Sequence, residues 1–262
     1  MSAAGVATLD WWVVWRLTLA AVLRGVSDRV LGALWWILDP LLLLGVYALV
    51  FDGFLGFGRH PDQRAYPLFV ACALIPWRWF TLATTQGASA FSRNATVLSS
   101  IPVDREAVLL SEWIAASAQA LAGVAVLLAA MLVYRCPITW NLLWLLPPLA
   151  VLAALGLGVG YLLCPLFVML PDLRDLYTAL LRLGWFLSPG LYPLARVPES
   201  VRGIYAAANP FVGILEGLRR PIHAGLPPDW SALAWSALWA VALLAIGRLV
   251  FRRLANDAVR ML

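Results

Sequence analysis

The chain contains no lysine, and this absence excludes one class of activity. A nucleotide-binding P-loop uses the lysine of the pattern G-x-x-x-x-G-K-[ST] to reach the phosphates, so this chain cannot carry one. Charged residues make up only 13% of the 262 residues and apolar residues 63%, which excludes an ordinary soluble globular protein. Any ATP hydrolysis that the protein depends on must therefore come from a separate partner.

Cysteine and histidine are also scarce. Cys72, Cys136 and Cys164 are far apart and odd in number, which indicates neither a disulfide framework nor a metal cluster. His60 and His223 fall in predicted loops, where a solvated side chain is the simpler interpretation. The patterns H-E-x-x-H and G-x-S-x-G are absent, which weakens the interpretation as an intramembrane enzyme. We expect no catalytic residue, no metal site and no cofactor bound by this chain.

Long apolar segments dominate what is present. Several of them approach or exceed the roughly 20 residues that a helix needs to cross a bilayer. The net charge of +5 comes from basic residues that cluster at membrane-adjacent turns, so we expect no nucleic acid partner. The whole chain is predicted to be one all-α polytopic domain with six transmembrane helices, over residues 34–57, 66–91, 107–134, 142–170, 176–187 and 230–251.

The two ends of this domain differ from its middle. In residues 1–30, apolar residues such as Trp12 and Trp15 recur at helical spacing between charged ones. This pattern predicts an amphipathic helix that lies in the membrane interface. Residues 31–192 hold the first five spans, and residues 230–262 hold the sixth span and a cytoplasmic tail.

The stretch between the fifth and sixth spans is rich in helix-breaking residues. The segment S-P-G-L-Y-P at residues 188–193 removes backbone donors and adds flexibility, which predicts the end of the fifth helix. A second break at residues 209–210 precedes a short predicted helix over residues 211–218. Pieces this short cannot span a bilayer, and broken backbone at membrane depth must be buried in protein or line a wet cavity. We therefore predict short re-entrant helices at an outer gate, within residues 193–229.

Arginines are distributed unevenly between the two sides of the predicted bundle. Six spans place both termini on one side, and the positive-inside rule assigns that side to the cytoplasm. The gate stretch carries four arginines on the outer side, which weakens this signal without reversing it. The arginines assigned to the cytoplasmic side are Arg16, Arg24, Arg29, Arg93, Arg105, Arg174, Arg248, Arg252, Arg253 and Arg260, and those of the short outer loops are Arg59, Arg64 and Arg135.

A series of short motifs resembles a known family. L-G-A-L-W-W at residues 31–36 is followed by D-P-L, by L-I-P-W at residues 74–77 and by F-R-R-L at residues 251–254. Between the last two, residues 174–219 contain R-D-L, F-L-S-P, Y-P, V-P-E, N-P and E-G-L-R in that order. In order and spacing these motifs are similar to those of the permease subunits of ABC-2-type exporters of O-antigen, teichoic acid and capsule polysaccharides. The resemblance covers nearly the whole chain.

The resemblance implies a function and a set of partners. The chain would be a permease that moves a polysaccharide, expected to be lipid-linked, out across the bacterial plasma (inner) membrane. Its partners would be a second copy of the chain, two ATPase subunits that bind ATP and Mg²⁺, membrane lipid and the glycan. A drug or lipid exporter of the same type is the alternative. A membrane enzyme is disfavoured by the missing catalytic motifs, and a simple scaffold by the broken outer stretch.

The polar connection between the second and third spans is the first candidate site. Residues 92–106 are long enough for a short helix over residues 95–100. This helix resembles the coupling helix that docks on the ATPase subunit in the family, and a plain solvated loop is the alternative. The candidate coupling residues are Arg93, Asn94, Thr96, Val97, Leu98, Ser99 and Arg105.

Aromatic side chains are the second candidate site. Most of the 14 tryptophans are expected in interfacial belts or in packing. The remaining aromatic rings suit a conduit, because their apolar faces can stack on sugar rings without directional hydrogen bonds. The candidate substrate path comprises Trp35, Trp36, Trp77, Arg78, Trp79, Trp185, Phe186 and Tyr192.

Charged residues inside the predicted spans call for partners. Glu112 and Arg182 both lie roughly 8–10 Å from the cytoplasmic side, so we predict that they form an ion pair or share a polar cavity. Arg78 lies near the bilayer centre, where an unpaired arginine costs about 3 kcal/mol. It is expected either to pair with Asp52 or to line the conduit and meet acidic groups of the cargo. Asp39, inside the first span, is expected to cap backbone or to face protein.

Overall fold

The computed structural model of the chain describes residues 9–27, 30–56, 66–136 and 139–262. Within these ranges the regular elements are all helical, which confirms the predicted all-α fold. Short 3-10 helices and one π-helical segment (Ala48–Phe54) accompany the α-helices. The α-helices are α1 (Trp11–Ser27), α2 (Trp35–Tyr47), α3 (Tyr66–Ala88), α4 (Ala90–Arg93), α5 (Ala95–Ser100), α6 (Arg105–Val133), α7 (Leu146–Met169), α8 (Leu173–Leu187), α9 (Glu199–Ala208), α10 (Phe211–His223) and α11 (Trp230–Arg260).

The described residues contain five helical segments that are long and apolar enough to cross a membrane. They correspond to five of the six predicted spans, and the polytopic membrane class is confirmed. The remaining predicted span is α8, whose 15 residues rise about 22 Å and so fall short of the roughly 30 Å apolar core. The five segments are Gly32–Phe51, Tyr66–Ala88, Arg105–Val133, Trp140–Met169 and Trp230–Arg260.

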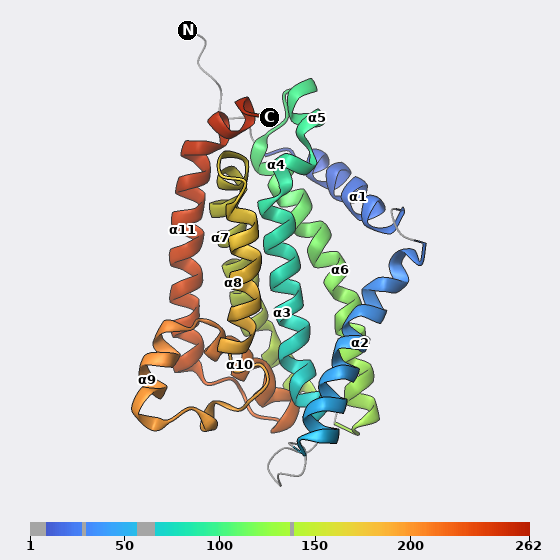
Figure 1. The fold of residues 1–262 in the computed structure, drawn as a ribbon, viewed down its shortest axis with the longest axis vertical. Coiled ribbons are helices and arrows are strands. Elements are labelled where there is room, and N and C mark those ends of the chain that lie inside the picture. The colour runs from blue at the N-terminus through green and yellow to red at the C-terminus, as the bar shows by residue number, and fades with distance from the viewer. Residues whose placement is uncertain (1–8, 28–29, 57–65, 137–138) are drawn as a thin grey trace.

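The helices form an upright bundle with distinct ends (Figure 1). α3 runs through its middle and is the most enclosed of the long segments. α4, α5 and the C-terminus lie at one end of the bundle, and α9 and α10 lie at the other (Figure 1). The chain thus separates the predicted coupling loop from the predicted gate by the full length of the bundle. The outer loop predicted at residues 58–65 lies outside the described residues.

Helix α1 lies obliquely across one end of the bundle (Figure 1). Val14, Thr18 and Ala21 are its buried residues, and Thr18 Oγ1 donates a hydrogen bond to the carbonyl oxygen of Ser111 in α6. Trp11 and Trp15 are each about two-thirds exposed. An exposed apolar face on a helix oblique to the bundle agrees with the amphipathic interfacial helix predicted for this segment.

Helices α7 and α11 approach very closely because glycines lie between them. A Cβ atom at Gly158 would meet the backbone nitrogen of Leu244 at 2.6 Å, and one at Gly247 would meet the carbonyl oxygen of Gly158 at 2.2 Å. Neither distance is compatible with a side chain. These glycines of α7 and α11 therefore serve packing within the chain.

Two helices extend beyond their predicted ends. α11 continues past residue 251 to Arg260, because Phe251, Ala255 and Ala258 are buried in a hydrophobic cluster with α4 and α7. α10 continues to His223 instead of ending near residue 218, because Pro221 and Ile222 in its last turn are buried. Burial of these turns against neighbouring helices outweighs the arginines and the proline that predicted an earlier end for each helix.

Candidate functional site

The predicted coupling loop contains the short helix that the sequence predicts. α5 covers residues 95–100, and it projects from the end of the bundle together with the short α4 (Figure 1). Thr96 and Ser99 are exposed, whereas Val97 and Leu98 are partly buried and Leu98 packs on the cluster that contains Phe251. The loop therefore offers a small exposed helical surface, and Leu98 anchors the loop to the bundle.

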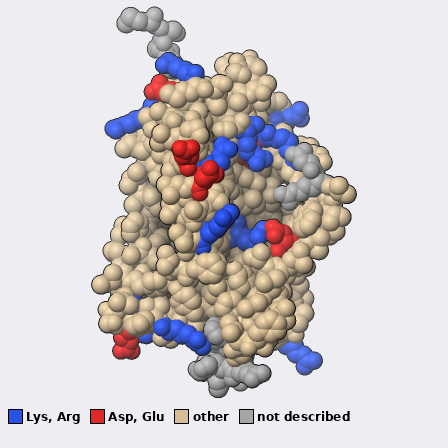
Figure 2. Space-filling model, in the orientation of Figure 1, with Lys and Arg blue, Asp and Glu red and all other residues tan. Residues whose placement is uncertain are grey.

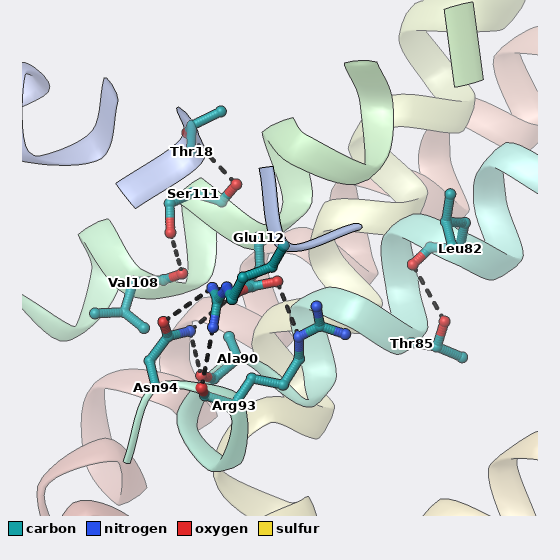
Figure 3. Close-up of polar contacts among 10 residues, drawn as sticks. Thr18, Leu82, Thr85, Ala90, Arg93, Asn94, Val108, Ser111 and Glu112 are labelled. Atoms are coloured by element: carbon teal, nitrogen blue, oxygen red, sulfur yellow. Dashed lines mark hydrogen bonds and ion pairs between the residues drawn. The ribbon is translucent and has the colours of Figure 1, made fainter. Parts of the chain in front are cut away.

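Two of the candidate coupling residues contact a buried carboxylate of α6. Arg93 and Asn94 converge on Glu112 of α6 (Figure 3). Asn94 Nδ2 donates to Glu112 Oε1 at 2.9 Å and to the carbonyl oxygen of Ala90 at 2.9 Å. Arg93 Nε lies 3.2 Å from Glu112 Oε2. Arg105, the last candidate, is partly buried, and its Nε has no hydrogen-bond partner in the described structure.

Helix α1 completes this charge cluster. Arg24 Nη2 donates to Glu112 Oε1 at 2.7 Å and to Asn94 Oδ1 at 3.2 Å, and Arg24 Nη1 donates to the carbonyl oxygen of Arg93 at 3.2 Å. Glu112 is fully buried, while the two arginine side chains are each 38% exposed. One buried carboxylate thus joins α1, the coupling loop and α6. We call Arg24, Arg93, Asn94 and Glu112 the junction cluster.

The predicted pair of Glu112 and Arg182 is wrong. Glu112 is paired with Arg24 and Arg93, and Arg182 lies in a groove on α8. Depth along a helix can be estimated from sequence, but the direction in which a side chain points around the helix axis depends on how the helices pack. α1 and α4 supply the arginines because both fold against α6, which the sequence alone does not reveal.

The second candidate site is a groove between α2, α3 and α8 with a volume of about 430 Å³. Of the predicted path residues, Trp77, Arg78, Trp185 and Phe186 line it. Trp77 and Trp185 lie with ring centroids 5.7 Å apart, and Trp185 Nε1 donates to Tyr47 Oη at 2.8 Å. The rings are therefore held in place by neighbours from three helices.

Other predicted path residues lie elsewhere. Trp35, Trp36 and Trp79 line a smaller cavity of about 110 Å³ against α6, and Arg78 lines this cavity as well as the groove. Tyr192 lines neither of these two spaces, and its hydroxyl donates to the carbonyl oxygen of Phe186 at 3.3 Å. The structure therefore divides the predicted path into two spaces that share Arg78.

Arg78 is paired with Asp39 of α2. The interpretation of Arg78 as one half of a structural ion pair is supported, but its partner is Asp39, one helical turn from Trp35 and Trp36 on α2. The side chain of Asp52, the predicted partner, lies outside the described residues. Asp39 faces protein, one of its two predicted roles, and its carboxylate serves Arg78 instead of a helix cap. Figure 2 shows basic side chains and one acidic side chain at mid-height of a surface whose other charges lie toward the two ends.

One buried arginine was missed by sequence analysis. Arg219 was assigned to the outer loop, but it is only 3% exposed and lies in α10. Its Nη2 donates to the carbonyl oxygen of Gly190 at 2.6 Å, its Nη1 lies 3.0 Å from Glu216 Oε1, and its guanidinium lies 3.7 Å from the centroid of the Phe69 ring. The signal that could have revealed it is the i,i+3 spacing of Glu216 and Arg219 on an amphipathic helix.

Arg219 and its contacts hold the predicted gate together. Tyr66 Oη, at the start of α3, donates to the carbonyl oxygen of Leu191 at 3.0 Å. Asn209 Nδ2 donates to the carbonyl oxygen of Leu187 at 3.1 Å, so the segment after α9 caps the end of α8. The broken backbone after α8 is thus tied to α3, α9 and α10 by hydrogen bonds, as buried irregular backbone requires.

Comparison with known proteins supports the resemblance stated above. The chain is 29% identical over 224 residues to the O-antigen export system permease protein RfbA of Myxococcus xanthus, covering 84% of each chain. It is 26% identical over 251 residues to the polysialic acid transport protein KpsM of Escherichia coli, covering 91% of this chain and 94% of that protein. A permease protein RfbA of Klebsiella pneumoniae is 24% identical over 229 residues, covering 87% of this chain and 86% of that protein. No family model matches the chain.

Proposed function

We propose that this chain, a relative of O-antigen and polysialic acid export proteins over most of its length, is the permease subunit of an ABC polysaccharide exporter. The observation that carries the proposal is this similarity, which covers 84% of the chain in one relative and 91% in the other. The finer proposal is that the cargo is a lipid-linked glycan that leaves the cytoplasm. The permease contributes the path, and a separate ATPase subunit with its ATP and Mg²⁺ contributes the energy.

The coupling step is proposed to begin at α5. Its exposed residues Thr96 and Ser99 form the surface on which an ATPase subunit would dock. The junction cluster would carry the movement onward, because Glu112 connects α4 and α5 to α6 and, through Arg24, to α1. Polar groups buried in a low-dielectric site are strongly coupled to one another, so these segments are expected to move together.

The path is proposed to run along the groove between α2, α3 and α8. Its aromatic rings offer flat apolar surfaces on which sugar rings of different composition can slide. The groove is open on one side, and a second copy of the chain is proposed to close it. The gate formed by residues 188–198 and α9–α10 would then control the exit, with both termini in the cytoplasm.

The proposal is tested by reconstituting the chain with an ATPase subunit encoded beside its gene. ATP-dependent glycan transport into vesicles is expected only when both proteins are present, and hydrolysis is expected to be absent from the chain alone. The chain with Ser99→Trp should bind the ATPase subunit about tenfold more weakly, because a bulky residue disrupts a docked helix. Ser200→Trp on α9, at the opposite end of the bundle, serves as the matched control and should bind normally. ATP hydrolysis by the purified chain, or transport without the partner, would contradict the proposal.

A further inference from the structure

The groove between α2, α3 and α8 has a polar half that aromatic stacking does not explain. Arg78, Thr81 and Thr85 of α3 face Thr178 and Arg182 of α8 across it. The spacings of three and four residues place each set on one side of its helix. Polar side chains on two facing helices thus converge on one space, toward the α5 end of the groove, while Trp77 and Trp185 lie toward the gate end.

The charges in this half do not cancel. Arg78 is neutralised by Asp39, its partner from α2. Arg182 makes no ion pair or side-chain hydrogen bond within the part of the chain that the structure describes. An arginine carries five N–H donors and stays charged, so Arg182 leaves one positive charge with unused donors in the groove. Within the depth of a bilayer such a charge is costly unless water or an anion meets it.

A hydroxyl group beside these arginines is also unpaired. The Thr81 Oγ1 atom is buried and has no hydrogen-bond partner in the described structure. By contrast, the hydroxyls of Thr85 and Thr178 donate to carbonyl oxygens of their own helices. Buried polar atoms are almost always satisfied in native proteins, so an orphaned hydroxyl that lines a groove indicates a missing ligand or water.

We propose that Arg182, Thr81 and the remaining donors of Arg78 bind an oxyanion of the cargo, while the adjacent rings hold its sugar. The ligand class is a phosphate or carboxylate attached to a glycan or to its lipid carrier, because a planar guanidinium binds both groups through paired hydrogen bonds. Asp39 limits the site to one net positive charge, so an anion is bound but released again. This inference rests on the proposed function and adds a preference for acidic over neutral cargo.

The experiment measures binding by the full chain in nanodiscs of phosphatidylcholine, which has no net charge. Two matched pairs of probes separate the sources of the anion. Oligogalacturonate and the neutral galactose oligomer test a sugar carboxylate, and isoprenyl phosphate and isoprenyl alcohol test a lipid phosphate. At least one acidic probe is expected to bind about tenfold more tightly than its neutral counterpart. The pair that shows the difference identifies the source.

Three variants test the assignment of residues. Arg182→Gln should abolish the preference for the acidic probe, and Arg182→Lys should retain part of it, because lysine keeps the charge but not the planar fork. Arg182 is exposed, so neither change is expected to prevent folding. Thr81→Val should weaken acidic binding less than Arg182→Gln does. Arg174→Gln, on the same helix but not lining the groove, is the control and should retain the full preference.

The outcomes separate this inference from the proposed function. Equal binding of acidic and neutral probes, or a preference that survives Arg182→Gln, overturns the oxyanion site even when the chain transports glycan with its ATPase partner. A preference that disappears equally in Arg174→Gln also overturns it. Conversely, a preference that depends on Arg182 upholds the site even if reconstitution with the ATPase subunit fails, and that failure would count against the proposed function alone.

Discussion

At the scale of single residues, charged side chains join segments that are far apart in the chain. Glu112 connects α1, α4 and α6, Arg78 is joined to Asp39 of α2, and Arg219 connects α10 to the backbone after α8. Each of these groups needs its partner, because an unpaired charge in a low-dielectric interior is strongly destabilising. Such residues are therefore sensitive reporters of whether the surrounding helices are assembled correctly.

Glu112→Gln is expected to lower the free energy of unfolding by about 1–3 kcal/mol, because Arg24 and Arg93 would face each other without a counter-charge. Both arginines are partly exposed, and solvent screening reduces their repulsion. Denaturant titration of the protein in detergent micelles measures it. Asp257→Asn, which breaks the exposed pair with Arg260, is the control and should change stability by less than about 0.5 kcal/mol. Equal effects of the two substitutions would show that the junction cluster is not structural.

Arg219→Lys is expected to loosen the gate at a cost of about 2 kcal/mol. A lysine ammonium is a compact charge and cannot contact Gly190, Glu216 and the Phe69 ring at the same time.

Hydrogen exchange should detect this loosening as faster exchange of the backbone amides in residues 188–196. The neighbouring Arg220→Lys is the matched control, because Arg220 is not part of the contacts around Gly190. Unchanged exchange in Arg219→Lys would mean that Tyr66 and Asn209 hold the segment without help from Arg219.

At the scale of helices, the contact between α7 and α11 depends on glycines, which have no side chain to keep the two backbones apart. Between apolar helices in a membrane there is little hydrophobic drive to associate, so close packing must supply the attraction. The backbones of Gly158 and Leu244 are close enough to exclude a Cβ atom. Tyr161 of α7 and Arg248 of α11 also meet at Glu106 of α6, where they form a polar contact nearer to the α5 end.

Gly158→Ala is expected to destabilise the protein by about 1–3 kcal/mol, because α11 must move away from α7. Gly160→Ala, two residues further along α7, is the matched control. A Cβ atom there meets nothing within 4 Å, so the change should be neutral or stabilising by up to about 1 kcal/mol. Thermal unfolding of both variants in the same detergent compares them directly. Similar losses for the two alanines would contradict the close approach of the helices.

At the scale of the whole molecule, the two candidate sites lie at different levels of one bundle. The coupling loop and α1 lie at one end, the gate lies at the other, and the groove between α2, α3 and α8 lies between them (Figure 1). The proposed function requires this order, because the ATPase subunit would act at one end of the path and the cargo would leave at the other. It also makes a definite prediction about which residues are accessible from which side of the membrane.

Cysteine labelling tests this arrangement in intact cells. Cys72 and Cys164 are buried, so only Cys136 has to be replaced by serine to give an unreactive background. In that background Ser200→Cys on α9 is expected to react with a membrane-impermeant maleimide from outside. Ser99→Cys on α5 should react only after the cells are permeabilised. Reaction of both positions from the same side would contradict the proposed orientation.

The sequence by itself determined the features that depend on local composition and spacing. Long apolar segments predicted the helical membrane fold, the prolines and glycine of residues 188–193 predicted the end of α8, and the polar connection predicted α5 at residues 95–100. These signals are local, because backbone hydrogen bonding and residence in an apolar medium constrain each segment separately.

Only the tertiary structure decided which side chains meet. Depth along the chain suggested that Glu112 pairs with Arg182, yet helix rotation turns Glu112 toward Arg24 and Arg93 and leaves Arg182 in the groove. The burial of Arg219 and the continuation of α11 to Arg260 likewise follow from contacts between distant segments. Each of these depends on the rotation and tilt of helices against one another, which packing sets and which spacing within one segment cannot encode.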